Sequence, residues 1–319
     1  MGDIEIGADH LLFRADVIGA GRSDADLRRD VRTGVVERVW QGAYLPAADG
    51  LADHAETVER HRATVIAAAR SGGPGRVASH VSGAAMHRIP MFEPDLSKVH
   101  FTSATTGKTV ARGVIHQARL SESDVVIIDD IPVTSLARTV CDVARTGTLH
   151  QAVCVLDSGL HLGVTVDELD EQVLRLRRHH GSVLLRTAVP LANGLSESVG
   201  ESVSRLVLAE HPLIPMPECQ VEICVEMNGR RKVRADFGWR DADGVLRVVG
   251  EFDGRFKYHR SSPFGDRLPE DVIYQEKLRE DAIRATGPLV VRWTWSETMR
   301  PKVLHPKVIA VLTTAGIIA

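Results

Sequence analysis

Cysteine is scarce in this chain, and the four cysteines that it contains form no C-x-x-C pair. A structural zinc site needs two such pairs or an equivalent set of His and Cys ligands. Cys219 and Cys224 are separated by four residues and could form half of a zinc site, but the sequence offers no second pair. We therefore expect reduced, buried thiols and no structural metal on the cysteines.

The chain also lacks an excess of charge, a long apolar run and any biased tract. Its net charge is −3 and its pI is about 6.5, so nucleic-acid binding would have to come from local basic patches. No apolar run approaches the roughly 18 residues that cross a bilayer. The first residues include Asp3, Glu5 and Asp9 instead of a basic leader. We expect a cytoplasmic protein with no membrane partner.

An ordinary globular composition is spread over a long chain. Apolar residues make up 44% and charged residues 25%, as in typical folded proteins. At 319 residues the chain exceeds what one hydrophobic core usually serves. We expect an α+β multidomain protein with domains over residues 1–72, 73–190 and 191–319.

The first segment shows the order helix, turn, helix, hairpin. A short helix is expected over residues 9–19, followed by a Gly-Ala-Gly break. A second helix opens at Ser23, which forms a capping box with Asp26. The branched and aromatic run that follows contains a Gln41-Gly42 turn and predicts a two-stranded hairpin. This order is typical of a winged helix.

Basic side chains mark the second helix and the hairpin. Arg28, Arg29 and Arg32 recur at helical spacing, and Arg38 lies in the expected wing. One interpretation is a recognition helix that presents arginines to phosphates and guanine edges of DNA. The other is a solvated face with internal ion pairs, because aspartates alternate with these arginines.

The middle region combines short strands with helices. An amphipathic helix over residues 54–71 ends at a Gly-Gly-Pro-Gly stop, which marks the first domain boundary. Residues 98–133 contain short β-like runs separated by polar turns, and residues 134–180 have a helical pattern. The middle domain is therefore of the α/β kind.

Histidines are scattered through this middle region. They are His80, His87, His100 and His116. None of them shows the i,i+4 pairing beside carboxylates that a helical metal site uses. We interpret them as surface or packed side chains and assign no chemistry to them.

Residues 11–46, "SHVSGAAMHRIP" and "IPVTSLARTVCDVAR" together resemble AbiEi-type antitoxins. The shared pattern is a winged helix, a Ser/Ala-rich helix ending in His-x-x-Pro, and a helix opened by Val-Thr-Ser-x-x-Arg-Thr. The resemblance covers about the first half of the chain. It implies binding to operator DNA and repression of a toxin gene. A further possibility is that residues 75–190 bind a cognate toxin protein.

Acidic residues concentrate in the last third of the chain. The segment "KVRADFGWRDADGVLRVVGEFDG" predicts a β-hairpin with its turn at residues 241–244. A centred turn pairs Asp236 with Val249 and places Glu251 diagonal to Asp236 on one face, with Asp253 further along. A slip of the register stays open.

Carboxylates gathered in this way favour a bound cation. Like charges raise each other's pKa unless a cation neutralises them, and hard oxygen ligands suit Mg²⁺ or Mn²⁺. A metal so held can ionise a water molecule for attack on a phosphodiester. The expected reaction is nucleic-acid hydrolysis.

Five motifs in order, "GESVSR", "RADFGW", "VVGEFDGRFKY", "QEKLRED" and "GPLVVRWTW", resemble the PD-(D/E)xK nuclease superfamily. The branch is that of very-short-patch repair endonucleases and DUF559-type domains, and the resemblance covers residues 195 to about 300. It implies a restriction-endonuclease-like α/β core. It further implies Asp236 and Glu251 as the metal ligands and Glu201 as an accessory acid on the leading helix.

The chain departs from that pattern at one position. The superfamily has a lysine two residues after the second acid, where this sequence has Asp253. Lys257 or Lys277 could supply the missing cation from another position.

Each acidic residue also has a structural interpretation. Glu201 could pair with Arg205 on its own helix, and the two hairpin acids could be exposed partners of Arg234 and Arg247. Two functions follow. The first is a DNA-binding, metal-dependent endonuclease. The second is an AbiEi-like repressor or antitoxin whose nuclease-like domain is catalytically degenerate.

Overall fold

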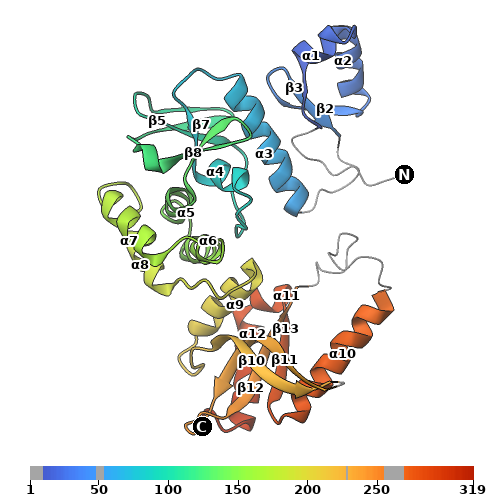
Figure 1. Cartoon of the computed structure of the whole chain (residues 1–319), viewed down its shortest axis with the longest axis vertical. Helices are drawn as coiled ribbons and strands as arrows, with labels where there is room; N and C mark the ends of the chain where they lie inside the picture. The colour runs from blue at the N-terminus through green and yellow to red at the C-terminus, as the bar shows by residue number, and fades with distance from the viewer. Residues whose placement is uncertain (1–9, 48–53, 228, 255–268) are drawn as a thin grey trace. The chain divides into compact units, whose positions relative to one another are not determined.

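The computed structural model describes residues 10–47, 54–227, 229–254 and 269–319. The described residues form an α+β protein with three sheets and many helices (Figure 1). The chain divides into two compact units, Met1–Ala192 and Asn193–Ala319.

The first part of the N-terminal unit is a small antiparallel sheet with two helices. Its elements are β1 (Leu12–Phe13), α1 (Arg14–Gly19), α2 (Asp24–Arg32), β2 (Val36–Trp40) and β3 (Ala43–Pro46), with the sheet order β1-β3-β2. The helix expected over residues 9–19 begins later than predicted. Leu12 and Phe13 instead pair with Tyr44 and Ala43, so the chain is extended until Arg14.

Local sequence signals set the ends of α2 and of the hairpin. Ser23 Oγ accepts a hydrogen bond from the Asp26 backbone N–H at 3.2 Å, and Asp26 Oδ2 accepts one from the Ser23 N–H at 3.0 Å. The predicted capping box is therefore present. Gly42 has φ +71° in the hairpin turn, a conformation that favours glycine.

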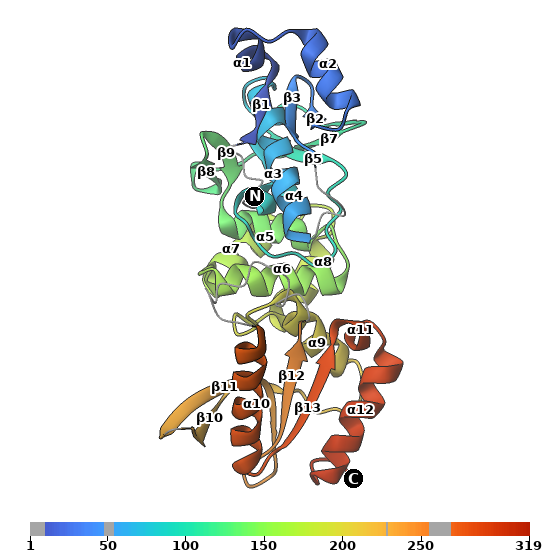
Figure 2. The same ribbon diagram turned by 90° about the vertical axis from the view of Figure 1, so that its right-hand side faces the viewer.

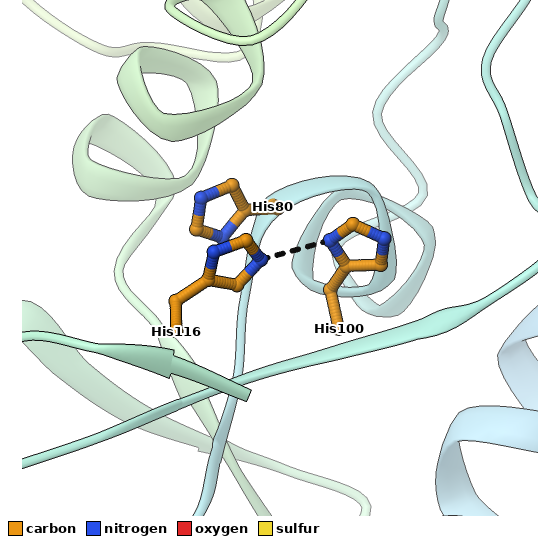
Figure 3. A group of neighbouring side chains, drawn as sticks. All are labelled: His80, His100 and His116. Atoms are coloured by element: carbon orange, nitrogen blue, oxygen red, sulfur yellow. Dashed lines mark hydrogen bonds between the residues drawn. The ribbon is translucent and has the colours of Figure 1, made fainter. Parts of the chain in front are cut away.

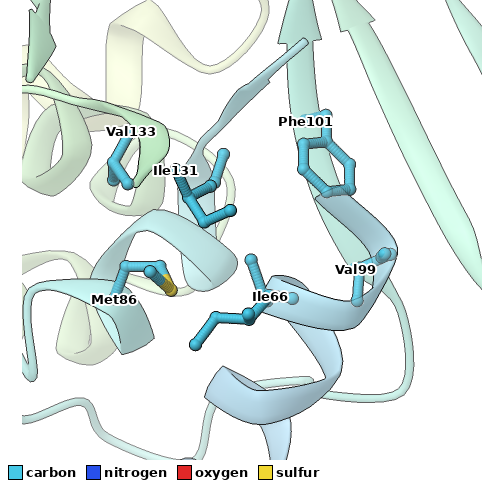
Figure 4. Close-up of a cluster of buried hydrophobic side chains, with 9 residues drawn as sticks. Ile66, Met86, Val99, Phe101, Ile131 and Val133 are labelled. Atoms are coloured by element: carbon cyan, nitrogen blue, oxygen red, sulfur yellow. The ribbon is translucent and has the colours of Figure 1, made fainter. Parts of the chain in front are cut away.

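Helix α3 (His54–Arg70) joins two hydrophobic clusters. Its Ala63 and Ala67 pack with Val39 and Leu45 of the small sheet. Other residues of the same helix pack into the cluster of the larger sheet (Figure 4): Val65, Ile66 and Ala68 with Ala78, Met86, Val99, Phe101, Ile131 and Val133. The helix thus links the parts on either side of the boundary expected at residue 72.

The larger sheet of this unit is six-stranded and mixed. Its strands are β4 (Val77–Ala78), β5 (Val99–Ser103), β6 (Lys108–Val110), β7 (Gly113–Gln117), β8 (Val125–Ile128) and β9 (Ile131–Thr134). Their order is β6-β7-β5-β4-β9-β8, with β5 and β7 parallel. The short strands predicted within residues 98–133 are confirmed.

Helices complete this unit. They are α4 (His80–Met86), η2 (Glu122–Asp124), α5 (Leu136–Ala144), α6 (Leu149–His161), α7 (Val166–Arg175), α8 (Ser182–Ala188) and η3 (Val189–Leu191). The helical pattern predicted for residues 134–180 is confirmed.

Asp142 on α5 is fully buried and accepts hydrogen bonds at 2.8 Å from Nε of both Arg138 and Arg145.

The C-terminal unit is a four-stranded sheet with helices. Its elements are α9 (Val199–Ala209), β10 (Glu218–Glu226), β11 (Arg230–Arg240), β12 (Leu246–Asp253), α10 (Pro269–Ala285), β13 (Leu289–Thr294), α11 (Trp295–Thr298) and α12 (Pro301–Thr314). The order is β10-β11-β12-β13, with only β12 and β13 parallel among these pairs. Helices α10 and α12 flank β12 and β13 (Figure 2). Strand β10 was not among the elements expected from the sequence.

Two glycines let this unit pack tightly. A Cβ on Gly200 would lie 2.0 Å from the Phe252 ring, and one on Gly250 would lie 2.6 Å from Trp293. The fully buried Trp293 donates from Nε1 to Ser204 Oγ on α9 at 2.9 Å. Helix α9 therefore lies directly against β13 and against β12, the strand that bears Glu251.

The hairpin register differs from the predicted one by two residues. Gly238 pairs with Val249, where we expected Asp236. One residue of the difference comes from the turn, which is centred on Asp243, and the other from the irregularity between Trp239 and Arg240. Continued by two residues, this register places Asp236 opposite Glu251. A shift of two residues preserves the face of each side chain, so the acidic pair still shares one side of the sheet.

Of the cysteines, Cys141 and Cys154 are buried, Cys219 is half-buried and Cys224 is exposed, so the expectation of buried thiols holds for only two. Among the described residues, no helix combines the length and the apolar character that crossing a membrane would require.

Candidate functional site

Asp236 lies on β11 and is partly buried. Its Oδ2 accepts a hydrogen bond from the backbone N–H of Phe252 at 2.7 Å. Phe252 follows Glu251 directly on β12, so this bond holds the Asp236 carboxylate against the strand of the second acid. The two residues that the sequence proposed as metal ligands therefore lie on adjacent strands.

Glu251 is buried, with 7% of its surface exposed, and both its oxygens face guanidinium groups. Oε1 lies 2.9 Å from Nη2 of Arg279 on α10, and Oε2 lies 2.8 Å from Nη2 of Arg292 on β13. Arg292 is the parallel-strand partner of Glu251 in the sheet. The charge of this carboxylate is neutralised within the protein.

Glu201 is also buried, and its carboxylate serves the start of α9. Oε1 accepts from the Ser198 hydroxyl at 2.7 Å, while Oε2 accepts from the Glu197 backbone N–H and from Gln220 Nε2, both at 2.9 Å. Ser198 in turn caps the helix by accepting from the Glu201 N–H. These bonds tie the first turn of α9 to β10 and account for the burial of the charge.

The two exposed arginines proposed as partners of Asp236 and Glu251 form ion pairs with other acids. Arg234 forms its ion pair with Glu197, and Arg247 pairs with Asp241 at 2.6 Å. This interpretation was wrong because it assumed that both acids faced solvent, whereas Glu251 is buried against Arg279 of α10 and Asp236 is bonded to the backbone of β12.

Two of the three remaining predicted site residues are described by the structure. Asp253 ends β12 and is partly buried, and Lys277 on α10 is exposed. Lys257 lies outside the described residues. Within the described ranges, no three carboxylates of this unit bring one oxygen each within 4.8 Å of one another. The acidic residues are neighbours in the fold without forming a three-ligand group there.

This donor set does not fit a magnesium ion. Mg²⁺ needs carboxylate oxygens that are free to enter a near-octahedral shell at about 2.0–2.1 Å. Glu251 presents both of its oxygens to arginines, and Asp236 gives one oxygen to a backbone N–H. This arrangement therefore supports no reaction step through a metal.

Sequence reasoning missed Arg279 and Arg292. Arg292 interrupts the otherwise apolar strand "LVVRWT", and a charge in a buried strand indicates a buried partner. Arg279 lies in "QEKLRED", a motif that we had assigned only by resemblance. The periodicity of α10 could have placed Arg279 toward the sheet, but not beside a particular acid.

The four arginines proposed to bind DNA are all exposed. Arg29 pairs with Asp26 at 3.0 Å, and Arg38 donates from Nε to the Trp40 carbonyl at 3.3 Å. Arg28 and Arg32 make no ion pair within the described part of the chain. The internal-pair interpretation therefore applies to Arg29 and not to Arg28 or Arg32.

The aspartates of α2 are held by other groups. Asp24 accepts from Arg14 at 2.7 Å, and this partner keeps the pKa of Asp24 below its usual value. Asp30 pairs with Arg22, and Asp26 is held by the cap at Ser23. Because the three aspartates of α2 are bound to these groups, the exposed surface of the helix presents the guanidinium groups of Arg28 and Arg32.

A groove lies beside the expected wing. It is lined by Glu37, Arg38 and Trp40 of β2 and by residues of α3, and by Lys98 and Arg112, which directly precede strands β5 and β7 of the larger sheet. The Arg112 guanidinium carbon lies 5.1 Å from the centre of the Trp40 ring. Positive charge beside an aromatic ring thus continues from β2 into the neighbouring sheet.

Two proteins of Mycobacterium tuberculosis, from strains CDC 1551 / Oshkosh and ATCC 25618 / H37Rv, resemble part of the chain. Both are described as uncharacterized, and each is 34% identical over 121 residues. The match spans 38% of this chain and 42% of each relative's length. No protein-family model matches the chain.

Among solved structures, the crystal structure of the RV2827C protein from Mycobacterium tuberculosis is similar with a TM-score of 0.36 and 13% identity. The alignment covers 67% of this chain and 83% of that protein.

Proposed function

We propose that this chain is a DNA-binding protein in which residues 10–46 act as a winged helix. The observation that carries the proposal is the exposure of Arg28 and Arg32 on α2 while the aspartates of that helix are bound by other groups. A helix of this kind can enter the major groove, where arginine recognises guanine and phosphate oxygens.

Arg38 and the basic groove beside it would extend the contact along the duplex. Arg38 lies on β2, the strand that precedes the hairpin turn, and Lys98 and Arg112 line the same groove. Such residues bind phosphates without reading sequence, and they fix the orientation of the protein on DNA. A local patch of this kind is consistent with a chain whose net charge is only −3.

The binding experiment uses fluorescence anisotropy of the full chain on a labelled duplex over a range of salt concentrations. In the variant carrying Arg28→Ala and Arg32→Ala we expect weaker binding. The slope of log K against log salt should fall in magnitude by about two, because each phosphate contact contributes about 0.9.

The matched control carries Arg178→Ala and Arg186→Ala, which remove the same charge from exposed positions of the same unit. This control should bind like the wild type. If the α2 variant keeps both its affinity and its salt slope, the winged-helix proposal is wrong.

For residues 193–319 we propose a restriction-endonuclease-like domain that is catalytically degenerate and holds DNA or a partner protein without cutting. The two arginines on Glu251 support this proposal, because they occupy a carboxylate that a metal would need. Together the two units would form a cytoplasmic repressor or antitoxin, with a cognate toxin as a protein partner through residues 75–190.

Metal-dependent phosphodiester hydrolysis is the second candidate. It is favoured by one observation, the register that places Asp236 and Glu251 on adjacent strands and one side of the sheet. It requires Glu251 to exchange its arginine partners for a cation.

A further inference from the structure

Three histidines that lie far apart in the sequence come together in the N-terminal unit. His100 and Thr102 are two residues apart on β5 and share one face, and Thr102 pairs with His116 on the parallel strand β7. His80, the first residue of α4, reaches the same place from a third element. We define this group, His80, His100 and His116, as the histidine cluster (Figure 3).

The rings of the histidine cluster are in direct contact. The ring of His80 lies over that of His116 with centroids 3.7 Å apart, and His100 Nδ1 lies 3.0 Å from His116 Nε2. One ring nitrogen from each residue lies within 4.8 Å of the other two. A tetrahedral zinc ion with bonds of about 2.0–2.1 Å separates its nitrogen ligands by about 3.3 Å. The ring nitrogens are thus near this spacing, but the stacked rings of His80 and His116, only 15° from parallel, would have to rotate before their in-plane lone pairs could converge on one ion.

The backbone of His80 is strained. Its φ is +53°, in the left-handed region that non-glycine residues rarely adopt. Such a conformation is energetically unfavourable, and residues that adopt it cluster at functional sites. Here the strain turns the first residue of α4 so that its ring faces the two strands.

Outer contacts hold the rings in place. His80 Nδ1 lies 3.0 Å from Ser79 Oγ, and the Thr102 hydroxyl donates to that same oxygen at 2.8 Å. The His100 backbone N–H donates to Ser82 Oγ at 2.8 Å. Metal-binding histidines are commonly oriented by partners of this kind.

Arg145 contacts this cluster, and it shares the buried Asp142 carboxylate with Arg138. Its Nη2 donates to His80 Nε2 at 2.9 Å, its Nε donates to the buried Asp142, and its Nη1 donates to the His180 carbonyl at 3.1 Å. A metal ion at His80 would compete only with the first of these bonds. The other two can keep the guanidinium in place.

We propose that the histidine cluster binds one Zn²⁺ ion, with a ring nitrogen of each of the three histidines as ligand. Imidazole nitrogen suits zinc, and three protein ligands leave a fourth position for water or another ligand. The site lies wholly within the N-terminal unit and does not depend on DNA binding or on the acidic residues of the other unit.

The first experiment titrates the full chain with Co²⁺ as a spectroscopic substitute for zinc. It uses a Cys224→Ser background, because that thiol is exposed, and excess Mg²⁺ to occupy surface carboxylates. We expect one Co²⁺ per chain with visible d–d absorption, displaced by Zn²⁺. His100→Gln and His116→Gln should weaken binding by at least about 100-fold, the upper end of what losing an outer-shell partner costs.

His87→Gln is the matched control, because His87 is also a partly buried histidine of this unit but bonds to the Thr134 carbonyl instead. It should bind Co²⁺ as the wild type does. Absence of saturable binding, or binding that both cluster variants retain, would overturn the proposal.

A second measurement does not depend on the folding of any variant. X-ray absorption at the zinc edge of the zinc-loaded wild-type chain should show imidazole scattering from three histidines. A shell made only of oxygen or sulfur ligands would reject the histidine cluster as the site.

Discussion

Glu251 Oε2 lies 2.8 Å from Nη2 of Arg292, its direct neighbour on the parallel strand β13. Arg279 approaches the other oxygen from α10, so one buried carboxylate links a strand and a helix of the C-terminal unit. A buried acid is costly unless it is paired, and here two cations pair with it. The acid thus has a structural role that is sufficient to explain its burial.

This role predicts a stability effect at the ion pair. Arg292→Met should lower the free energy of unfolding by about 2 kcal/mol, because it removes one of two partners from a buried carboxylate. Combining it with Glu251→Gln should cost less than the sum of the two single changes, since the residues interact. Urea unfolding of the four chains measures this coupling.

The exposed pair of Arg240 and Glu218 supplies the control for that cycle. Arg240→Met should change stability by less than about 1 kcal/mol, as is usual for surface pairs. If both arginine substitutions changed the free energy of unfolding equally, the buried pair of Glu251 and Arg292 would stabilise the protein no more than a surface pair does.

The arginines also bear on catalysis. We expect the purified chain to leave supercoiled plasmid uncut with Mg²⁺ or Mn²⁺, because Glu251 is not available to a metal. Agarose electrophoresis against Asp236→Asn and Glu251→Gln provides the comparison. Cutting by the wild type that both variants lose would establish the hydrolytic alternative and contradict the degenerate domain.

A third prediction concerns acid stability and His61. This ring bonds to the Leu96 carbonyl at 3.1 Å and to the Ser82 hydroxyl at 3.0 Å, and burial lowers its pKa from 6.5 to about 4. The unfolded chain therefore binds a proton more readily than the folded one. The contribution of this group to the free energy of unfolding is complete above pH 6.5. It should fall by about 3 kcal/mol as the pH decreases toward 4.

His61→Gln should remove this share of the pH dependence, whereas His161→Gln, at an exposed position, should leave it. Unfolding by urea at several pH values measures both. An unchanged slope for His61→Gln would mean that the ring is not buried in its neutral form.

Local signals in the sequence anticipated much of the secondary structure. The capping box at Ser23, the turn at Gly42 and the strands within residues 98–133 depend on near neighbours, and each is present. Strand β1 was misread as helix, because its pairing with Tyr44 and Ala43 is a contact that local propensity does not encode. The hairpin register was two residues off because neither the turn centred on Asp243 nor the irregularity after Trp239 left a clear signal.

The sequence by itself determined an α+β chain of several parts, the acids on neighbouring strands and the arginines of α2. Only the tertiary structure decided which charges meet. Glu251 and Arg292 are 41 residues apart, and His80 and His116 are 36 apart, so their contacts arise from parallel strand pairing and helix packing. The acidic pair that looked like a metal site is held by arginines, and the histidines that looked scattered form a cluster. Periodicity predicts the face on which a side chain lies, but the partner that it meets depends on elements brought together from distant parts of the chain.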